Sequence, residues 1–295
     1  MRIGVDLGGT KIEVVAIADE GSQLFRHRLP TPAGDYEGTL ATIESLVGEV
    51  ESRYGRGASV GVGTPGAIDP ATGLLRHSNS VVLNGKPLER DIGQRLGRAI
   101  QMANDANCLA LSEAIDGSGA GRHVVFAAIL GTGVGGGIAV DRHVLQGRNN
   151  IAGEWGHNHL PWSAGDEVPG PLCYCGKRGC LETFLSGPAF AASFKTATGR
   201  TMTPAEIAAA AQSGDGEASS ALSAYEDRLA RGLAAVVNII DPDAIVLGGG
   251  LSKISRLYEN VPLLIATYTI SPQIQVELLP ALHGDSSGVR GAAWL

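Results

Sequence analysis

The segment Asp6-Leu7-Gly8-Gly9-Thr10-Lys11 lies near the start of the chain and decides the fold class. An apolar run, residues 2–7, leads into the turn and a second, residues 11–18, leaves it, so the pattern predicts two strands joined by a glycine turn. Such a turn lacks bulky side chains, which lets backbone N–H groups approach phosphate oxygens closely. Taken alone, the segment fits an ordinary Gly-Gly hairpin with an Asp cap equally well.

A second segment of the same design follows later in the chain. Gly131-Thr132-Gly133 joins a predicted strand at residues 124–130 to another at 135–140. Two hairpins of one design, one per domain, are what binding ATP between two related domains requires. The repeat therefore favours phosphate binding over an ordinary hairpin.

The length fits two domains, because 295 residues exceed the usual size of a single core. We place the boundary near residues 117–121, a stretch of small residues, which gives domains 1–117 and 118–295. A loop-rich insertion is expected at 149–187, and the last helix, 287–295, is expected to return to the first domain. Further strands are predicted near 24–29, 59–63, 99–103 and 244–247, and further helices at 36–54, 88–96, 106–114, 204–212 and 218–240.

The composition excludes several classes of protein. Apolar residues make up 44% and charged residues 18% of the chain, which is typical of an ordered globular protein. The net charge of -7 comes from scattered acidic residues, and no basic run is long enough to bind a row of phosphates, so no nucleic-acid partner is expected. The start lacks a secretory signal pattern, and every apolar stretch is shorter than the roughly 20 residues that span a bilayer. We therefore expect a cytoplasmic protein with no membrane partner.

Four cysteines are present, and a reducing compartment favours metal binding or catalysis over disulfides. Three of them lie in the run Cys173-Tyr174-Cys175-Gly176-Lys177-Arg178-Gly179-Cys180, shortly after His157. One imidazole and three thiolates form a closed tetrahedral shell suited to structural Zn²⁺, and a redox pair is the alternative. Ligation through one ring nitrogen would leave the other nitrogen of His157 free to donate to a substrate hydroxyl or a carboxylate. Cys108 is expected in the core, and His77 and His159 are not expected to be ligands.

Asn104-Asp105 follows the predicted strand 99–103 and precedes a predicted helix. Ligands of open α/β sheets collect at such strand ends. Phosphoryl transfer to an alcohol needs a carboxylate within hydrogen-bond reach of the hydroxyl. Asp105 fits that base, but it fits a helix N-cap equally well, and Asn104 could also be the cap.

The chain resembles the actin-like ATPase superfamily and, within it, the ROK family of sugar kinases and repressors. The motifs that carry the resemblance span nearly the whole chain in order: the Asp6 to Lys11 segment, Gly63-Thr64-Pro65-Gly66, Asn104-Asp105-Ala106-Asn107, the second glycine hairpin, Glu154-x-x-His157, the cysteine cluster and Gly248-Gly249-Gly250. The resemblance implies an α/β, two-lobed actin-like (ribonuclease H-like) fold with ATP and sugar in the interdomain cleft. It also implies a homodimer.

The resemblance assigns roles to individual residues. Asp105 would deprotonate the sugar hydroxyl, and Asp6 would organise Mg²⁺. The residues expected to contact ATP are Asp6, Gly8, Gly9, Thr10, Lys11, Gly131, Thr132, Gly133, Gly248 and Gly249. The residues expected to satisfy the sugar hydroxyls are Gly66, Asn79, Asn104, Asp105, Glu154, His157 and Glu182. The structural zinc ligands would be His157, Cys173, Cys175 and Cys180.

Three functions compete. The first is an ATP-dependent sugar kinase, and the second is a ROK repressor that senses sugar without phosphorylating it. Such repressors carry an added N-terminal helix-turn-helix domain, whereas the first predicted strand begins at residue 2 here. A metal-dependent nucleotide hydrolase is the third. Asp6, Lys11 and Asp105 favour the kinase.

Three segments indicate the hexose. Residues 153–158, 83–85 and 283–294 resemble bacterial fructokinases that also accept mannose. We therefore expect 6-phosphorylation of D-fructose, with mannose as the next best substrate. Glucose and N-acetylated hexosamines stay open as alternatives, because one hydroxyl or methylene often gives modest discrimination.

Overall fold

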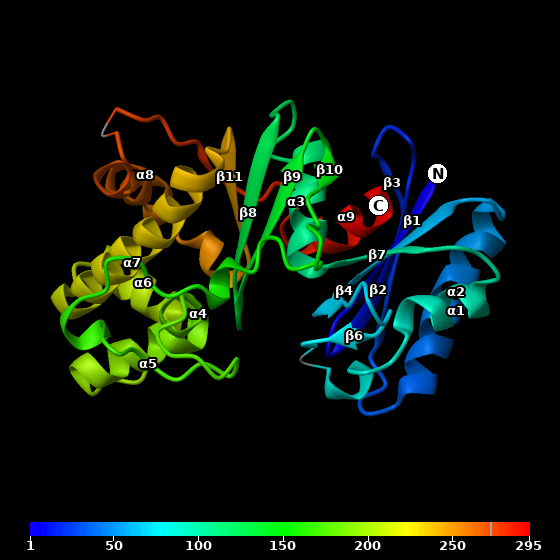
Figure 1. The fold of residues 1–295 in the computed structure, drawn as a ribbon, viewed down its shortest axis with the longest axis horizontal. Helices are drawn as coiled ribbons and strands as arrows, with labels where there is room; N and C mark the ends of the chain where they lie inside the picture. Colours follow the sequence, from blue (N-terminus) through cyan, green and yellow to red (C-terminus); the bar gives the residue numbers. More distant parts are fainter. Residues whose placement is uncertain (79, 272) are drawn as a thin grey trace. The chain divides into compact units, whose positions relative to one another are not determined.

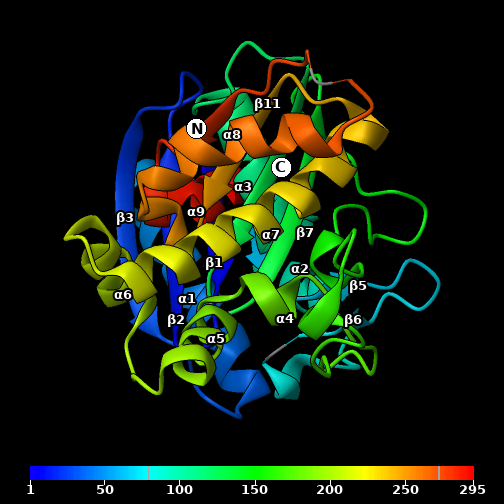
Figure 2. The same ribbon diagram turned by 90° about the vertical axis from the view of Figure 1, so that its left-hand side faces the viewer.

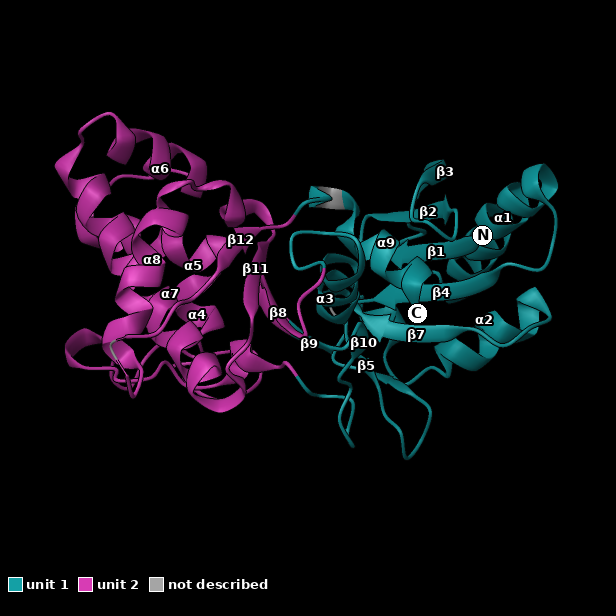
Figure 3. Cartoon of the chain, turned by 90° about the horizontal axis from the view of Figure 1, so that it is seen from above, with its two compact units in different colours: residues 1–120, 137–152, 282–295 teal, residues 121–136, 153–281 magenta. Residues whose placement is uncertain are grey.

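The computed structural model describes residues 1–78, 80–271 and 273–295 (Figure 1). This part of the chain forms two compact units, which Figure 3 shows in different colours. Unit 1 contains Met1–Ala120, Gly137–Ala152 and Leu282–Leu295, and unit 2 contains Gly121–Gly136 and Gly153–Ala281. Each unit is therefore built from separate stretches of sequence.

Unit 1 is built on a five-stranded sheet with the strand order β3-β2-β1-β4-β7. The strands are β1 (Arg2–Leu7), β2 (Lys11–Ile17), β3 (Gln23–Pro30), β4 (Ser59–Thr64) and β7 (Gln101–Asn104). The first three are antiparallel neighbours, whereas β1, β4 and β7 run parallel. Asp6 pairs with Gly63, and Thr64 pairs with Asn104. The motif-bearing ends of three parallel strands therefore meet at one edge of the sheet, where ligands of α/β proteins bind.

Helices cover both faces of this sheet. They are α1 (Tyr36–Tyr54), α2 (Leu88–Leu96), α3 (Asp105–Ile115) and α9 (Ser287–Trp294). Alternate residues of β2 point to opposite faces, so Val14 packs in the core with α1 while Val15 packs against α9. Gly4 and Gly61 let α9 approach the sheet, because a Cβ at either position would overlap an α9 carbonyl oxygen.

Short elements complete unit 1. They are β5 (Ala67–Ile68), β6 (Leu75–Arg76), β10 (His143–Val144) and the 3₁₀ turns Val81–Leu83 and Gly284–Ser286. A second five-stranded sheet has the order β10-β9-β8-β11-β12, and the division between the units falls within β9 (Val134–Val140).

Unit 2 combines strands of the second sheet with a group of helices. Its strands are β8 (Val124–Leu130), β11 (Ala244–Gly248) and β12 (Leu278–Pro280), and β11 runs parallel to both neighbours. Its helices are α4 (Glu182–Leu185), α5 (Gly187–Thr198), α6 (Pro204–Gln212), α7 (Gly216–Ile240) and α8 (Arg256–Tyr268), with 3₁₀ turns at Trp155–His157, Gly165–Glu167 and Gly250–Lys253. The long helix α7 contacts the other four helices, and α8 runs beside it (Figure 2).

The predicted strands and helices are present within a few residues of their expected ends. The sequence analysis missed the helices α4, α5 and α8 and the short strands β5, β6, β10 and β12. A proline, Pro262, lies inside α8 and hides its periodic pattern, and β12 has only three residues. In the described part of the chain, no helix combines the length and the apolar character that a membrane span requires.

Candidate functional site

In unit 1, the first glycine turn lies directly beside the Asp6 carboxylate. The Gly8 N–H donates to the Lys11 carbonyl over 3.0 Å and closes the turn. A Cβ at Gly8 would lie 2.9 Å from that same carbonyl oxygen, so this tight turn requires glycine. Gly9, Thr10 and Lys11 follow as exposed residues, within reach of a ligand beside Asp6.

Electrostatics single out Asp6 among these residues. Burial at the strand end, together with the Asp105 and Glu13 carboxylates, raises the pKa of Asp6 to about 7, and Lys11 and Arg28 partly oppose the rise. The Asp105 carboxylate is therefore close enough to disfavour ionisation of Asp6. A pair of neighbouring carboxylates is the donor set that Mg²⁺ prefers, and a bound cation would relieve their repulsion.

Asn104 and Asp105 have different tasks at the start of α3. The Asn104 side chain accepts a hydrogen bond from the Asn107 N–H over 2.7 Å and is therefore the N-cap. Asp105 is the first helical residue, is exposed, and accepts from the Ala106 N–H over 2.8 Å. The alternative that Asp105 is the cap is wrong. Its carboxylate instead lies where the helix dipole favours negative charge.

Gly66 and Asn104 line one small cavity of about 20 Å³ in unit 1. Gly66 has a φ of +88°, and a Cβ there would overlap the Arg76 carbonyl oxygen, so only glycine fits. Asn107 also lines the cavity, and its buried Oδ1 has no hydrogen-bond partner among the described residues. Asn79, which the sequence analysis assigned to the sugar site, lies outside the described residues.

In unit 2, three of the predicted segments come together. The Gly131 N–H donates to the Gly133 carbonyl over 3.0 Å, and the next N–H, of Val134, donates to Glu182 over 2.9 Å. Gly249 follows β11 with a φ of +83°, and a Cβ there would overlap the carbonyl oxygen of the last residue of β8. The second glycine turn thus lies against both Glu182 and the Gly248-Gly249 segment.

The predicted metal ligands also converge in unit 2. The ligand atoms of His157, Cys173, Cys175 and Cys180 all lie within 4.8 Å of one another. The Cys173 Sγ lies 3.6 Å from the His157 Nδ1, and the Cys175 and Cys180 sulfurs are 3.6 Å apart. A disulfide would bring sulfurs to about 2 Å. In a tetrahedral zinc shell, neighbouring ligand atoms are about 3.5–3.8 Å apart, so the donor set fits Zn²⁺.

Backbone hydrogen bonds join the His157 segment to the cysteine run. The Leu160 N–H donates to the Gly179 carbonyl, and the Leu181 N–H donates to the Asn158 carbonyl, each over 2.8 Å. These main-chain hydrogen bonds therefore keep His157 close to Cys180 independently of a bound metal. By contrast, Cys108 is buried in the core of unit 1, as predicted.

The second ring nitrogen of His157 was expected to be free to donate to a substrate hydroxyl or a carboxylate, but in the structure it has another partner. Its Nε2 lies 2.9 Å from the Tyr174 hydroxyl, and the two rings meet edge to face with centroids 5.1 Å apart. That nitrogen is therefore already engaged. Burial raises the pKa of Tyr174 to about 12, and so do nearby negative groups, Glu182 and Glu154 among them. The sequence offered one signal for Tyr174: it stands between two predicted metal ligands.

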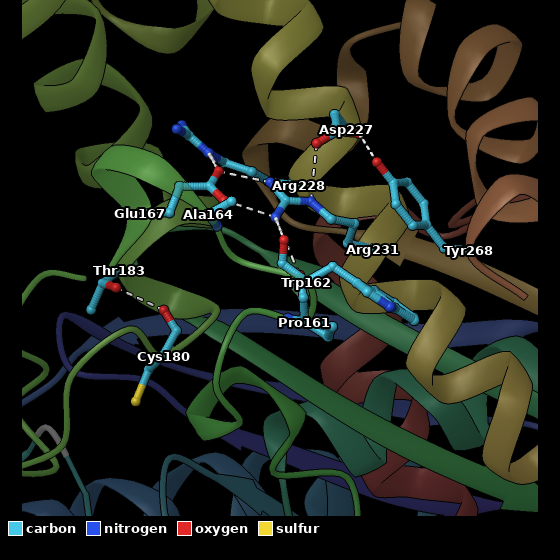
Figure 4. A network of polar contacts seen from close by, with 10 residues as sticks. All are labelled: Pro161, Trp162, Ala164, Glu167, Cys180, Thr183, Asp227, Arg228, Arg231 and Tyr268. Carbon is cyan, nitrogen blue, oxygen red and sulfur yellow. Dashed lines mark hydrogen bonds and ion pairs between the residues drawn. The ribbon is translucent and has the colours of Figure 1, made fainter. Parts of the chain in front are cut away.

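A buried network of ion pairs fixes the insertion on α7 (Figure 4). Arg231 donates to both oxygens of Glu167 over 2.7 and 2.8 Å, and to the carbonyls of Pro161 and Trp162 over 3.2 Å. Arg228 donates to the same Glu167 over 2.8 Å. Burial opposes ionisation, but the two guanidinium groups hold the pKa of Glu167 at about 2. The segment between His157 and the cysteine run is thereby anchored.

The residues nominated from the sequence thus form two groups. Unit 1 holds Asp6, Gly8, Gly9, Thr10, Lys11, Gly66, Asn104 and Asp105. Unit 2 holds Gly131, Thr132, Gly133, Glu154, His157, Cys173, Cys175, Cys180, Glu182, Gly248 and Gly249. The glycine turns, at equivalent places in two α/β units, are typical of the two-lobed actin-like ATPase fold.

The chain belongs to the ROK family, whose model matches residues 2–295. The N-acetyl-D-glucosamine kinase of Vibrio atlanticus is 39% identical over 299 residues, which cover 100% of this chain and 99% of that protein. The ROK hexokinase of Thermus thermophilus superposes with a TM-score of 0.88 at 30% identity, over 99% of this chain and 96% of that one. A ROK glucokinase of Streptomyces griseus, solved with glucose and AMPPNP, superposes with a TM-score of 0.79 at 30% identity, over 99% of this chain and 97% of that one. The protein is a ROK-family sugar kinase.

Proposed function

We propose that this kinase uses ATP and Mg²⁺ to phosphorylate the 6-hydroxyl of a hexose, with Asp105 as the base. The observation that carries the proposal is the position of Asp105, beside Asp6 at the start of α3, where Asn104 is the N-cap. The hydroxyl oxygen attacks the γ-phosphorus, its proton passes to Asp105, and the bond to the ADP oxygen breaks. Asp6 would hold Mg²⁺, which neutralises the phosphate charge.

Both glycine turns would lie along the phosphates of one ATP. Each turn presents exposed backbone next to an acidic side chain, Asp6 in unit 1 and Glu182 in unit 2. Gly249 packs closely against the end of β8, beside the second turn, which supports a role of the Gly248-Gly249 segment in binding the adenosine of the same ATP. The similarity to a glucokinase solved with AMPPNP supports the same use of ATP.

We propose D-fructose as the preferred hexose and mannose as the next best. The support is the resemblance of residues 83–85, 153–158 and 283–294 to fructokinases. Relatives at 30–39% identity carry names with different sugars, N-acetyl-D-glucosamine for one and glucose for another. Overall identity in this range therefore leaves the sugar open, and local segments carry more weight.

N-acetyl-D-glucosamine is the second candidate. It is favoured by the full-length match to N-acetyl-D-glucosamine kinases of Vibrio atlanticus and of Haemophilus influenzae, at 39% and 38% identity.

A coupled ADP-release assay over fructose, mannose, glucose and N-acetyl-D-glucosamine tests both candidates. We expect the highest kcat/KM with fructose, then mannose, with glucose poorer. A kcat/KM for N-acetyl-D-glucosamine about tenfold above the kcat/KM for fructose would favour the second candidate instead. ADP release that needs no sugar would identify a nucleotide hydrolase, and sugar binding without any ADP release would identify a sensor.

We also propose that His157, Cys173, Cys175 and Cys180 hold one Zn²⁺ that keeps the sugar site in shape. The bound ion would supply structural cross-linking between the segment that carries Glu154 and the segment that carries Glu182. Cys175→Ala should then lose the metal and weaken sugar affinity more than ATP affinity, as measured by metal analysis and calorimetry. Cys108→Ala, in the core of unit 1, is the control that should keep the metal. A metal-free wild type with full activity would exclude the proposal.

A further inference from the structure

A row of charged side chains crosses the unit 1 sheet on the face that α9 covers. The register pairs Asp6 on β1 with Glu13 on β2, and Glu13 with Arg28 on the edge strand β3 (Figure 3). Residues directly opposite each other on neighbouring strands point to the same face. Asp6 lies on the α9 face, because a Cβ at Gly288 of α9 would be 3.8 Å from its carboxylate carbon. Arg28 therefore lies level with Asp6, two strands away, on the same face of the sheet.

Glu13 links Arg28 to the middle of this row. Its carboxylate is buried, with 1% exposed, and its two oxygens accept from the Nε of Arg26 and from the Nε of Arg28. A buried carboxylate needs such partners, but one guanidinium already balances its charge. The second guanidinium gives the cluster of Glu13 and the two arginines one excess positive charge, next to Asp6.

Arg28 has donors available for a ligand. Its Nε is used by Glu13, and within the described residues neither of its two Nη groups has a hydrogen-bond partner. The side chain is exposed at the outer end of the row. A guanidinium that is held through its Nε presents both Nη groups together, and such a planar fork suits two oxygens of one phosphate. Glu13 thus sets the direction in which Arg28 presents its donors.

The proposed phosphate-binding turn lies directly beside this row. Asp6 precedes the turn and Lys11 follows it at the start of β2. Because Lys11 is two residues before Glu13 on the same strand, the two side chains point to the same face. Lys11 and Arg28 are also the two cations that oppose the rise in the pKa of Asp6. Two cations, one on β2 and one on β3, therefore lie beside the first glycine turn.

Arg26 is the contrasting position on the same strand. It binds the same buried carboxylate from the same face of β3, and it is exposed as well. Its register partner is Val15, so it lies two residues farther from the glycine turn than Arg28 does. Charged side chains on an edge strand discourage pairing with other chains, and this role is sufficient for Arg26. The two arginines therefore differ in their distance from the turn and not in their partner.

We infer that Arg28 is a phosphate-contacting residue of this kinase, whose Nη groups donate to phosphate oxygens of ATP, and that Glu13 positions it. The inference rests on the proposed binding of ATP at the first glycine turn. It adds to that turn a guanidinium from β3, a strand to which the sequence analysis assigned no functional residue.

Arg28→Gln and Arg26→Gln together test the inference, because each variant removes one ion pair from Glu13. Calorimetry with AMPPNP and Mg²⁺ should give a Kd about tenfold to a hundredfold higher for Arg28→Gln, the range for lost hydrogen bonds to a charged group. The KM for ATP should rise as well, whereas the Kd for fructose and for N-acetyl-D-glucosamine should equal the wild-type values. Arg26→Gln should bind AMPPNP as the wild type does, with a melting temperature close to that of Arg28→Gln.

Each other result overturns the inference. An unchanged Kd for AMPPNP in Arg28→Gln would make Arg28 an edge-strand charge only, and equal losses in both variants would mean a structural effect that acts through Glu13. If Arg28→Gln does not fold, Arg28→Lys keeps the positive charge but lacks the fork, and its Kd for AMPPNP should still rise at least about threefold. An unchanged Kd in Arg28→Lys would then count against the contact.

The wild type separates this inference from the proposed function. A wild type that does not bind AMPPNP would overturn the proposed ATP site together with the role of Arg28. A wild type that binds AMPPNP and phosphorylates a hexose, while Arg28→Gln does the same with unchanged constants, would overturn the role of Arg28 alone.

Discussion

At the residue scale, the neighbouring Asn104 makes the role of Asp105 testable. Since Asn104 supplies the cap of α3, the Asp105 carboxylate can be neutralised without loss of the helix end. Asp105→Asn should lower kcat by about 10²–10⁴-fold, because the amide fills the same volume but accepts no proton. Circular dichroism, melting temperature and nucleotide binding should match the wild type.

Asp35→Asn is the matched control for this variant. Asp35 is also an aspartate at a helix start, and it caps α1 by accepting from the Gly38 N–H over 2.9 Å. It lies outside the residues assigned to ATP and sugar, so its variant should keep full activity. Near wild-type turnover in Asp105→Asn would remove Asp105 from the chemistry.

The raised pKa of Asp6 predicts a conflict between stability and function. Its folded pKa of about 7 lies above the ordinary value of 3.8 for an aspartate, so the folded state binds an extra proton between these two pH values. Stability therefore falls as the pH rises between these values, and the full cost is present above the folded pKa. Asp6→Asn should raise the free energy of unfolding by on the order of 2 kcal/mol at about pH 8 and leave it unchanged near pH 4.

Denaturant unfolding at the two pH values measures this difference. The same variant should lose kinase activity, because a neutral amide is a poor ligand for Mg²⁺. Adding Mg²⁺ should stabilise the wild type more than Asp6→Asn above neutral pH. Equal stabilisation of the two proteins, or an Asn variant that is no more stable at high pH, would contradict the assignment.

Residue patterns predicted much of the site because they report on strand ends and ligand spacing. Asp6 and Asn104-Asp105 were assignable because each lies at the carboxyl end of a strand, and the cysteine run because its spacing suits a metal. Tyr174 and Glu167 were not, because their meaning depends on partners that the local sequence does not reveal. The partner of Glu167 is Arg231, 64 residues later.

At the element scale, that pair explains how a loop-rich insertion holds a defined shape. Glu167 and Arg231 are 8% and 5% exposed, so both charges are buried and depend on each other. Arg231→Met should lower the free energy of unfolding by roughly 3–5 kcal/mol, because it leaves Glu167 with a buried and weakly paired charge. Urea unfolding measures the change.

Arg200→Met is the control, because Arg200 forms ion pairs with Asp215 and Glu217 at the surface of the same unit. Its loss should cost at most about 1 kcal/mol. The pH dependence gives a second check. The folded pKa of Glu167, about 2, is below the ordinary value of 4.5 for a glutamate. Its contribution to stability is therefore complete above pH 4.5 and is lost as the pH falls toward 2. Equal losses for Arg231→Met and Arg200→Met would refute the anchoring role.

Element prediction succeeded where periodicity was uninterrupted and failed where a local feature masked it. The helix α1, with buried residues at helical spacing, was predicted with its observed bounds. The helix α8 was missed because of Pro262, and the three-residue β12 is defined by its pairing with β11. Pairing between distant segments is a tertiary property that a single sequence does not display.

At the scale of the whole molecule, the repeat of two glycine turns indicated the two-lobed fold, which the ROK family membership and solved relatives confirm. Which distant segments join each unit depends on packing that the repeat does not encode. The helix α9 joins unit 1 because Gly4 and Gly61 leave it room on the sheet. The chain enters unit 2 after Ala120 and leaves it for the last time after Ala281.

A buried carboxylate in unit 1 ties the chain beside these two crossings. Glu113 accepts from the Ser118 N–H over 2.9 Å, the Leu282 N–H over 3.0 Å and the Ser287 hydroxyl over 2.9 Å. Ser118 precedes the first crossing and Leu282 follows the last one. The segments at both crossings are therefore fixed on the unit 1 side. At these two crossings, any rotation between the units should occur in the few residues beyond this point; the other two crossings lie within β9 and after Ala152.

Sugar binding should close the two units about this region. In the proposed function both glycine turns, one in each unit, bind the same ATP, and closure would exclude water from the transfer. Small-angle X-ray scattering of Asp105→Asn with hexose and ATP should show a smaller radius of gyration than the same protein without ligands, since this variant binds without turnover. Glu113→Gln replaces an acceptor oxygen by an N–H₂ group, which cannot accept the hydrogen bonds that Glu113 receives. This variant should therefore weaken the closure and lower the melting temperature. A radius of gyration that stays constant while calorimetry proves sugar binding would show that phosphoryl transfer needs no movement of the units.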